Sequence, residues 1–348
     1  MRQGLTSQLD ALGHATIMMV KAAMTFEPVD IAAASTELQY TISLANTLRR
    51  KTSYLSSVIK GAGASPKDMT RLQRHAELIF AEAYLMRACM GIIDDNANVM
   101  AIIREGMNVR SAYQILKGLW KFLRKRAEGD GSDMKSPISP HTDREEQHSP
   151  STSTAGGDEN LSSILPNMHF DKKEGIDDEL IAGVRFGIGT FNLILSLLPS
   201  RALKLASFIG FSGSRPFGLA QLETASENMS DCIRSGLATL VLIFFHTVLS
   251  AHVQVPDFNL TRAAQLIATA LQRYPSSALH LYFRGKLLHR EGDLNEAMVA
   301  YRKSMQVQSI YTQLHHVCFW EMSRAHASLL QFDKSIECSE VHLPPSFT

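Results

Sequence analysis

The chain has 348 residues, with 35 Lys and Arg against 34 Asp and Glu and a formal net charge of +1, so no global field favours nucleic acid or an anionic membrane. Its four cysteines lie far apart without a CxxC pair, which gives no sign of a disulfide framework and favours a reducing compartment. The start of the chain lacks the apolar core of a signal peptide. We therefore expect a cytoplasmic protein.

Residues 1–126 predict helical hairpins, because apolar side chains recur at helical spacing throughout. The expected helices are Ala11–Met24, Val29–Arg50, Arg71–Met90 and Ala97–Arg126. Pro28 disfavours helix at the residue before it, so Asp30 is expected to cap the second helix. Ser65 is expected to cap a helix whose first position is Pro66.

Gly, Ser, Pro, Asp and Glu dominate residues 127–178, and large apolar residues are few there. Such a segment cannot bury enough apolar surface to offset the entropy of ordering, so it predicts a disordered insert. Ser136, Ser139 and Ser149 each precede a proline and are candidate phosphorylation sites beside a basic cluster at residues 121–126. The alternative is a solvated loop in which the Ser-Pro pairs are incidental.

Residues 179–256 contain two nearly uncharged stretches, Phe186–Ser200 and Ser235–Pro256. The second is long enough to be tested as a membrane span. Its polar side chains and the repeat-like region that follows it favour a buried helix, although a helix that is apolar all round fits either setting. Residues 186–190 contain two glycines, but the third glycine and the preceding strand of a phosphate loop are absent from the sequence pattern.

A tetratricopeptide pattern spans the segment from Ser277 to Gln308. That pattern has Trp-x2-Leu-Gly-x2-Tyr on a first helix and Ala-x3-Phe on a second. The matching, repeat-defining residues are Leu281, Gly285, Leu288, Ala297 and Tyr301. The small Gly285 and Ala297 would let two antiparallel helices approach, while the larger three side chains fill the core around them. Gly292 is expected to end the first helix.

A second copy of the pattern lies 38 residues later, a little beyond the usual spacing of about 34. The aligned pairs are Leu281 with Phe319, Arg284 with Met322, and Gly285 with Ser323. Before the first copy, Leu260–Tyr274 resembles the second helix of another hairpin, lying behind the long apolar helix. Residues 257–340 are therefore expected to form a stack of tetratricopeptide repeats.

Other stretches resemble one known family. They are Ala23-Met-Thr-Phe-Glu-Pro28, the run from Phe186 to Pro199, Leu203-Lys-Leu, and Ile209-Gly-Phe-Ser-Gly213. Their combination resembles the tetratricopeptide repeat protein 39 family, which includes the fungal inclusion-body clearance proteins. The resemblance implies a helical-repeat protein without known catalysis, linked to lipid droplets, protein quality control and adaptor roles. Members carry further helices before Ala11 and after Trp320, so the chain is expected to be truncated at both ends.

The first helices of such repeats are expected to line a concave groove. Counted from Gly285, the candidate partner-groove residues are Tyr282, Lys286, His289, Arg290, Trp320 and Arg324. Lys286 and Arg324 occupy equivalent positions, and two cations among aromatic side chains would bind an acidic peptide or a C-terminal carboxylate. The alternative is that these are solvated charges on a helix face.

No sequence pattern points to catalysis or to a cofactor. The adjacent His315 and His316, near Cys318, point about 100° apart on a helix and lack a fourth ligand, so no metal site is expected. There is no nucleophile elbow, P-loop, HExxH or kinase signature. Neither a small-molecule substrate nor a nucleic acid is indicated.

These features predict an all-α fold, a tetratricopeptide-like helical-hairpin solenoid with a long disordered insert and a tail at residues 341–348. The predicted function is a non-catalytic scaffold or adaptor for protein partners, in lipid homeostasis or protein quality control. The alternative is a membrane- or lipid-droplet-associated protein that contacts lipid through the stretch Ser235–Pro256 or the amphipathic helix Ser111–Arg126. The expected location is the cytoplasm, with lipid droplets or organelle membranes as peripheral sites.

Overall fold

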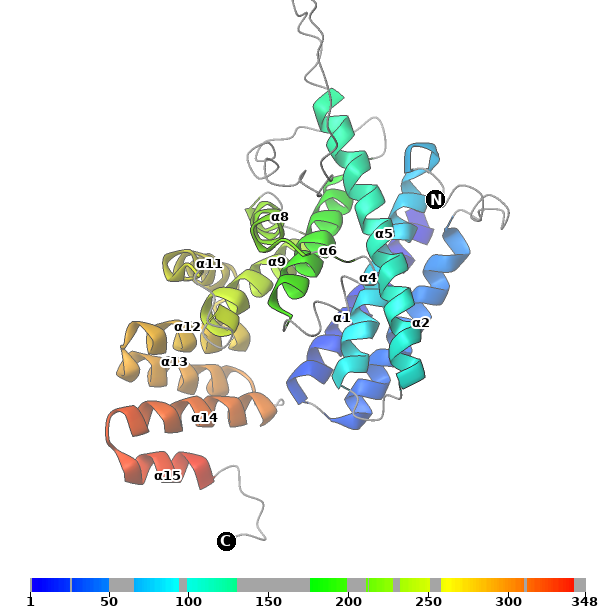
Figure 1. Cartoon of the computed structure of the whole chain (residues 1–348). Coiled ribbons are helices and arrows are strands. Elements are labelled where there is room, and N and C mark those ends of the chain that lie inside the picture. The colour runs from blue at the N-terminus through cyan, green and yellow to red at the C-terminus, as the bar shows by residue number, and fades with distance from the viewer. Residues whose placement is uncertain are drawn as a thin grey trace, which may run out of the picture.

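The fold is all-α, as a computed structural model of the chain shows (Figure 1). The structure describes residues 2–25, 27–49, 66–93, 99–129, 176–198, 211, 213–227, 232–250, 258–309 and 312–340. Within these ranges every regular element is a helix, and neighbours in the chain pack as hairpins. The predicted fold class is confirmed.

The described residues of the N-terminal part form four long helices, in the order in which they were predicted. They are α1 (Arg2–Thr25), α2 (Pro28–Leu48), α4 (Arg71–Ile93) and α5 (Val99–Gly129), with a short 3₁₀ turn η1 (Pro66–Asp68) before α4. Their apolar faces meet in two clusters, one between α1, α2 and α4 and the other between α4, α5 and α6 (Asp178–Leu197). α4 therefore lies in both cores.

The capping of one predicted helix, α2, differs in the structure. α2 begins directly at Pro28, and Asp30 does not cap it but accepts hydrogen bonds from Lys21 Nζ at 2.7 Å and Thr25 Oγ1 at 2.8 Å. Asp30 therefore links α2 to α1 through hydrogen bonds. α4 begins at Arg71, as predicted, after Thr70, whose hydroxyl and backbone bond reciprocally with Gln73 in a capping box; Pro66 is the first residue of the separate 3₁₀ turn η1. Ser65 lies outside the described residues.

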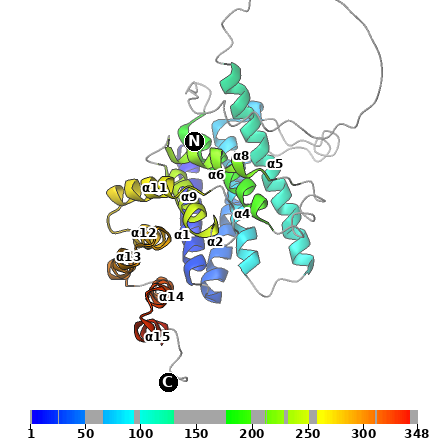
Figure 2. The same ribbon diagram turned by 60° about the vertical axis from the view of Figure 1, so that its left-hand side comes forward.

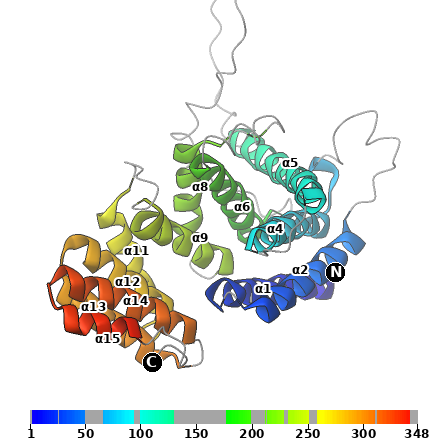
Figure 3. The same cartoon turned by 60° about the horizontal axis from the view of Figure 1, so that its bottom comes forward.

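Apolar helices form the middle of the molecule: α6, α8 (Arg215–Glu227), α9 (Ile233–Phe244) and a π-helical turn η3 (Phe245–Leu249) that continues α9. α6 contacts α4, α5, α8 and α9, so it joins the N-terminal helices to the rest. Figure 3 shows α6, α8 and α9 between the N-terminal helices and the C-terminal stack.

A close approach of α6 and α8 explains glycines in the apolar stretch. A Cβ on Gly189 would lie 3.0 Å from the carbonyl oxygen of Gly218, and a Cβ on Gly218 would lie 2.9 Å from that of Gly189. The two backbones therefore touch, which needs glycine on both helices. Residues 186–190 lie inside α6, so they form no loop that could cradle a phosphate.

The apolar helices are core helices in this fold. In the described part of the chain only α6 is long and apolar enough to cross a membrane, and 78% of its most apolar window is buried by neighbouring helices. α9 and η3 pack with α8 and α11 (Leu260–Arg273) in a third core cluster. The burial agrees with the buried-helix interpretation of these two stretches.

From residue 258 onward, the described residues form a C-terminal stack of five helices, which descends in chain order in Figures 1 and 2. They are α11, α12 (Ala278–Glu291), α13 (Leu294–Val307), α14 (Thr312–Ser328) and α15 (Phe332–Glu340). α11 packs against α9 and η3, as expected of the second helix of a preceding hairpin. α14 also contacts α1, so the first helix of the chain meets the last hairpin.

Residues 130–175, most of the predicted disordered insert, lie outside the described residues, and described structure reaches past both predicted boundaries, 127 and 178. α5 runs to Gly129, and the next described residue is Ile176, which is buried in the core. Asp177 then caps α6 by accepting a hydrogen bond from Leu180 N at 2.8 Å. The predicted phosphorylation sites Ser136, Ser139 and Ser149, and the tail at 341–348, lie outside the described residues.

Candidate partner-binding site

The first repeat hairpin, α12 and α13, is built around Gly285. A Cβ at this position would lie 2.6 Å from Tyr301 Cδ1 and 2.9 Å from Cζ, and closer still to Cε1. Tyr301 is fully buried beneath it. Gly292 has a φ of +89°, and the Asp293 N–H donates back to Leu288 O, so the left-handed glycine ends α12 as predicted.

The second hairpin, α14 and α15, repeats this arrangement with different chemistry. Ser323 takes the place of Gly285, and its hydroxyl lies 3.0 Å from Ser335 O and 2.8 Å from Ser339 Oγ. Ser335 and Ser339 are the counterparts, 38 residues later, of Ala297 and Tyr301. The helices of the second hairpin therefore meet through small hydroxyl side chains instead of a tyrosine under a glycine, and the predicted alignment of the two copies is confirmed.

A cluster of charged side chains joins α12 to α14. Glu321 on α14 is buried, and its carboxylate lies 2.7 Å from Lys286 Nζ, 3.3 Å from Arg324 Nη1 and 3.9 Å from His289 Nδ1. Burial, opposed in part by the charge of Glu321, lowers the pKa of His289. The cluster thus holds two permanent cations around one carboxylate.

The structure changes the expectation for Lys286. We predicted an exposed cation in the groove, but the side chain is only 9% exposed because α14 covers it, and its charge is paired with Glu321. Sequence reasoning missed Glu321, since the equivalent position in the first repeat is Phe283 and the repeat pattern specifies no acid there. The one available signal was an opposite charge 35 residues after Lys286, close to one repeat length.

Arg290 points away from the predicted groove. Its Nη1 donates to His246 O at 3.0 Å and to Ser250 Oγ at 2.8 Å, and its guanidinium lies 4.6 Å from the centre of the Phe258 ring. The π-helical turn η3 contains His246, and a π-turn changes which carbonyl groups the helix ladder leaves available. Arg290 therefore attaches the first repeat to the apolar helix, and its inclusion among the groove residues was wrong.

The remaining candidates line one side of the stack. Tyr282 is half-buried between the ring of Phe283 and that of Tyr301, with centroid distances of 5.4 and 5.8 Å. Trp320 is 57% exposed, and the side chain of Arg324 is 50% exposed. Trp320 and Arg324 are thus the groove residues that solvent reaches most freely.

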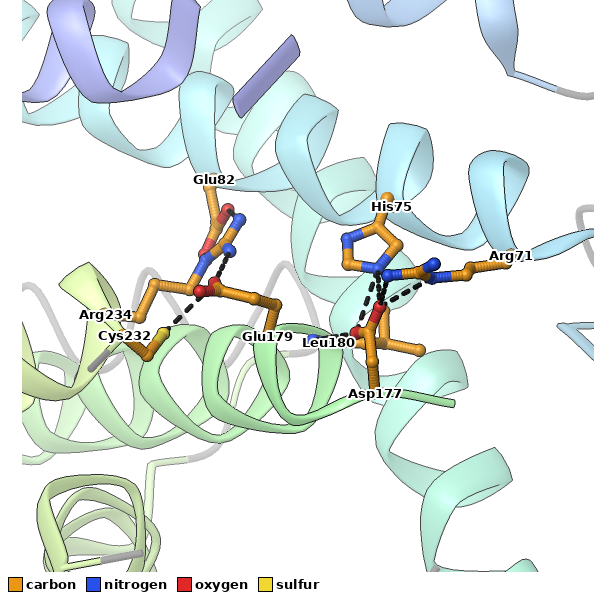
Figure 4. A network of polar contacts seen from close by, with 8 residues as sticks. All are labelled: Arg71, His75, Glu82, Asp177, Glu179, Leu180, Cys232 and Arg234. Atoms are coloured by element: carbon orange, nitrogen blue, oxygen red, sulfur yellow. Dashed lines mark hydrogen bonds and ion pairs between the residues drawn. The ribbon is translucent and has the colours of Figure 1, made fainter. Parts of the chain in front are cut away.

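A second polar network, which sequence analysis did not identify, lies in the middle of the molecule (Figure 4). Arg234 on α9 is fully buried and holds Glu82 on α4 through two hydrogen bonds of 2.8 and 2.9 Å. Its third nitrogen donates to Glu179 on α6 at 3.0 Å, and the Cys232 thiol donates to the same carboxylate at 3.1 Å. The network therefore ties three helices together.

Asp177 forms the other half of the network in Figure 4. Its carboxylate lies 3.0 Å from Nε2 of the buried His75 and 2.7 Å from Nε of Arg71. Desolvation alone would raise the pKa of Asp177, but the hydrogen bond and charge of His75, with Leu180 N–H and Arg71, hold that pKa well below its usual range. This ion pair joins the start of α6 to α4.

The network links α4, α6 and α9, and the thiol within it is a weak nucleophile. Burial, with the Glu179 hydrogen bond, raises the pKa of Cys232 to about 11, so the thiol stays protonated and is a poor nucleophile near neutral pH. Burial likewise raises the pKa of Cys318 to about 12. Among the described residues, no group of three His, Cys, Asp or Glu side chains is placed to hold a metal ion.

Comparison with known proteins identifies the family of the chain. The model of the family described as Iml2/Tetratricopeptide repeat protein 39 matches residues 1–342. The chain belongs to this family. Over 320 residues it is 26% identical to "Tetratricopeptide repeat protein ttc-39B" of Caenorhabditis elegans, an alignment that covers 92% of the chain and 48% of that protein. The chain thus spans about half the length of this curated relative, and no solved structure matches it significantly.

Family membership confirms the resemblance drawn from the apolar stretch. Its run from Phe186 to Pro199 forms most of α6, the helix on which the two halves of the molecule meet. Gly213, in another of the matching stretches, packs against the end of α6, where a Cβ would lie 2.5 Å from Leu195 Cβ. The described residues of this stretch, with Gly213, therefore lie where the N-terminal helices meet the middle helices of the molecule.

Proposed function

We propose that the chain is a non-catalytic scaffold or adaptor whose repeat hairpins bind protein partners. The observation that carries the proposal is the exposed Trp320 beside the half-exposed Arg324 on α14. A large aromatic ring left in water next to a guanidinium is the residue combination that dominates protein–protein interfaces. Repeat stacks of this kind present extended surfaces without a catalytic constellation.

The charge of the site indicates an acidic partner segment. Glu321 neutralises only one of its two permanent cations, Lys286 and Arg324, so the cluster keeps one positive charge. Since Lys286 is covered, Arg324 is the cation that an incoming carboxylate reaches, with Trp320 and Tyr282 as apolar neighbours. An acidic peptide or a C-terminal carboxylate therefore fits the site.

The test is a fluorescence-anisotropy titration of acidic peptides, with free or amidated C-termini, against the native chain and single variants. Trp320→Ala and Arg324→Gln should each weaken binding about tenfold or more. Arg284→Gln is the matched control, because Arg284 is an exposed arginine of α12 that lies off the groove side. Equal affinity for all four proteins would remove the groove from the proposal.

Proximity labelling in cells tests the wider scaffold function. The native chain and the Trp320→Ala/Arg324→Gln variant would each carry the labelling enzyme, with Arg284→Gln as the control. Partners bound through the groove should lose labelling in the double variant and keep it in the control. An unchanged set of labelled proteins would mean that this surface recruits no partner.

A second candidate function, peripheral contact with anionic lipid, has support from α5. Residues 106–127 contain six basic and no acidic side chains. Lys117, Lys121 and Lys125 are exposed and recur every four residues, so they share one helix face. The apolar face of α5 is buried in the core, so contact with lipid would be electrostatic and would not involve insertion of this helix.

Vesicle flotation tests this candidate. Vesicles that contain phosphatidylserine should carry the native chain to the top of the gradient at low salt, and phosphatidylcholine vesicles should not. Replacing Lys117, Lys121 and Lys125 with glutamine should abolish flotation. A native chain that stays in the bottom fraction with both vesicle types would exclude the lipid contact.

We also propose a role in lipid homeostasis or protein quality control, and a cytoplasmic location peripheral to lipid droplets or organelle membranes. The support is the resemblance to a family linked to these processes, together with the basic face of α5. Imaging of the tagged chain against a droplet dye, with and without the three lysine substitutions, tests the location. A diffuse signal that is unaffected by lipid loading would contradict it.

A further inference from the structure

The C-terminal stack meets the middle helices at η3, the π-helical turn. In an α-helix the Ser250 N–H would bond to His246 O, but here it bonds to Phe245 O and Val248 O. His246 O is therefore available to other donors, and it accepts from Arg290 Nη1 and from Ser250 Oγ, each at 3.0 Å. Arg290 belongs to α12, so the π-turn supplies the carbonyl group to which the first repeat is attached.

The side chain of His246 makes a second contact with the stack. The residue is 4% exposed, and its Nδ1 accepts a hydrogen bond from the Asn259 N–H at 3.2 Å. Asn259 is the N-cap of α11, where its side chain accepts from Arg262 N at 2.9 Å. One histidine therefore holds α11 through Asn259 and α12 through Arg290. We call His246, Asn259 and Arg290 the joint.

The joint requires the neutral form of the histidine ring. A ring nitrogen that accepts a hydrogen bond carries no proton, and on protonation it becomes a donor. Nδ1–H of His246 and the Asn259 N–H would then be two donors pointing at one another in a buried place. A buried donor without an acceptor is costly, so the contact with α11 is lost when the ring takes up a proton.

The charges around His246 also oppose a proton. The charged groups that reach it from the helices packed on it are Arg262 of α11 and Arg290 of α12, and burial, followed by the charge of Arg262, lowers the pKa of His246 to about 4. Glu223 and Glu227 on α8 bind Arg262. Among the described residues no carboxylate pairs with the histidine ring itself. A protonated ring would therefore have arginines beside it and no counter-ion.

We propose that the joint is an acid-sensitive attachment: a proton on His246 releases α11 and α12 from η3, while the hairpins of the stack stay folded. Contacts inside the first hairpin, such as that of Gly285 with the Tyr301 ring, do not involve His246. The inference goes beyond the proposed function, because it concerns how the repeats are held and not what they bind. In acidic surroundings the chain would loosen its repeats from the middle helices.

Hydrogen exchange of the full chain, followed by mass spectrometry and corrected for the intrinsic effect of pH, tests the proposal. The reporters are peptides covering residues 259–267, and peptides from α4 report on global unfolding. Because the pKa of His246 is lowered only in the closed joint, the open joint binds the proton first, and opening is favoured as the pH falls below about 6.5. The opening constant of the reporters should rise about 25-fold from pH 7.4 to pH 5.

Variants assign the rise to the joint. His246→Asn should abolish it, because the asparagine oxygen can take the place of Nδ1 as an acceptor but does not titrate. His280→Asn is the matched control and should keep the rise: His280 is also buried, but its Nδ1 lies 2.7 Å from Ser277 Oγ, and a hydroxyl can accept as well as donate. Arg290→Gln should raise the opening constant about tenfold at both pH values, since it removes the bond to His246 O and leaves the ring in place.

The native chain alone can overturn the proposal, whatever the stability of the variants, if its reporter peptides show no rise at pH 5. A rise that His246→Asn retains, or that His280→Asn removes, would overturn it as well. Reporter amides that open no more often than those of α4 would mean that the whole chain unfolds and that no separate joint exists. Unchanged exchange in Arg290→Gln would show that its bonds do not hold α12 to η3.

Discussion

Replacing Gly285 with alanine tests the packing that defines the repeat. An added Cβ would lie less than 3.0 Å from three atoms of the Tyr301 ring. The ring cannot move freely, because it is fully buried and lies against Tyr282. The helices must therefore separate, or the ring must leave its favoured position, and overpacking of this kind costs about 1–3 kcal/mol.

The same substitution has a favourable component, because alanine in a helix interior is about 0.5–1 kcal/mol better than glycine. The net expectation for Gly285→Ala is a loss of about 1–2 kcal/mol in the free energy of unfolding. Gly118 is the matched control: it lies inside α5, and a Cβ there would have no heavy atom within 4 Å. Gly118→Ala should therefore stabilise the chain by about 0.5–1 kcal/mol.

Urea unfolding followed by circular dichroism would measure both variants, and hydrogen exchange of the α13 amides would locate the effect. Tyr301→Leu removes the ring, so Gly285→Ala made in that background should no longer be destabilising. A Gly285→Ala protein as stable as Gly118→Ala, or a loss that persists without the ring, would refute the argument that Tyr301 requires glycine.

Three further predictions concern buried charges and backbone strain. Arg234→Met leaves Glu82 buried without a partner and should cost about 3–5 kcal/mol, most of which the added Glu82→Gln should restore, as measured by urea unfolding. Burial and the charge of a nearby arginine lower the pKa of His246 to about 4, so the chain should lose stability as the pH falls from about 6.5 to 4, by up to about 3 kcal/mol, and His246→Asn should flatten this dependence. Leu330 has a φ of 58° and is 74% exposed, so Leu330→Gly should raise the free energy of unfolding by about 1 kcal/mol. Ser328→Gly, in the helix before it, should lower the free energy of unfolding by a similar amount.

Each of the three has an outcome that contradicts it. If adding Glu82→Gln restored none of the stability lost in Arg234→Met, the loss would not come from an unpaired Glu82 carboxylate. Between pH 6.5 and 4 the unfolded chain would bind a proton at His246 that the folded chain does not, because the folded pKa is lowered. If the stability of the His246→Asn variant still fell over this range, the loss would belong to other groups. Equal effects of glycine at positions 330 and 328 would show that Leu330 carries no strain.

The sequence by itself determined where most helices lie and how each repeat hairpin closes. Helix placement depends on local periodicity and capping, which neighbouring residues carry, and Gly285 with Tyr301 lies within one hairpin. The weak points were helix starts such as that of α2, where the structure uses Asp30 to hold α1 rather than to cap. The local rules identified Asp30 as a hydrogen-bonding residue but did not identify its partners on α1.

Only the tertiary structure decided which charges face solvent. Periodicity places Lys286 and Arg290 on exposed-looking sides of α12, but α14 covers one and η3 binds the other. Arg234 pairs with a carboxylate 152 residues away, a choice fixed by how α4 and α9 meet across α6. A sequence pattern sets the direction of a side chain on its helix, whereas the stacking of helices distant in the chain determines what that side chain meets.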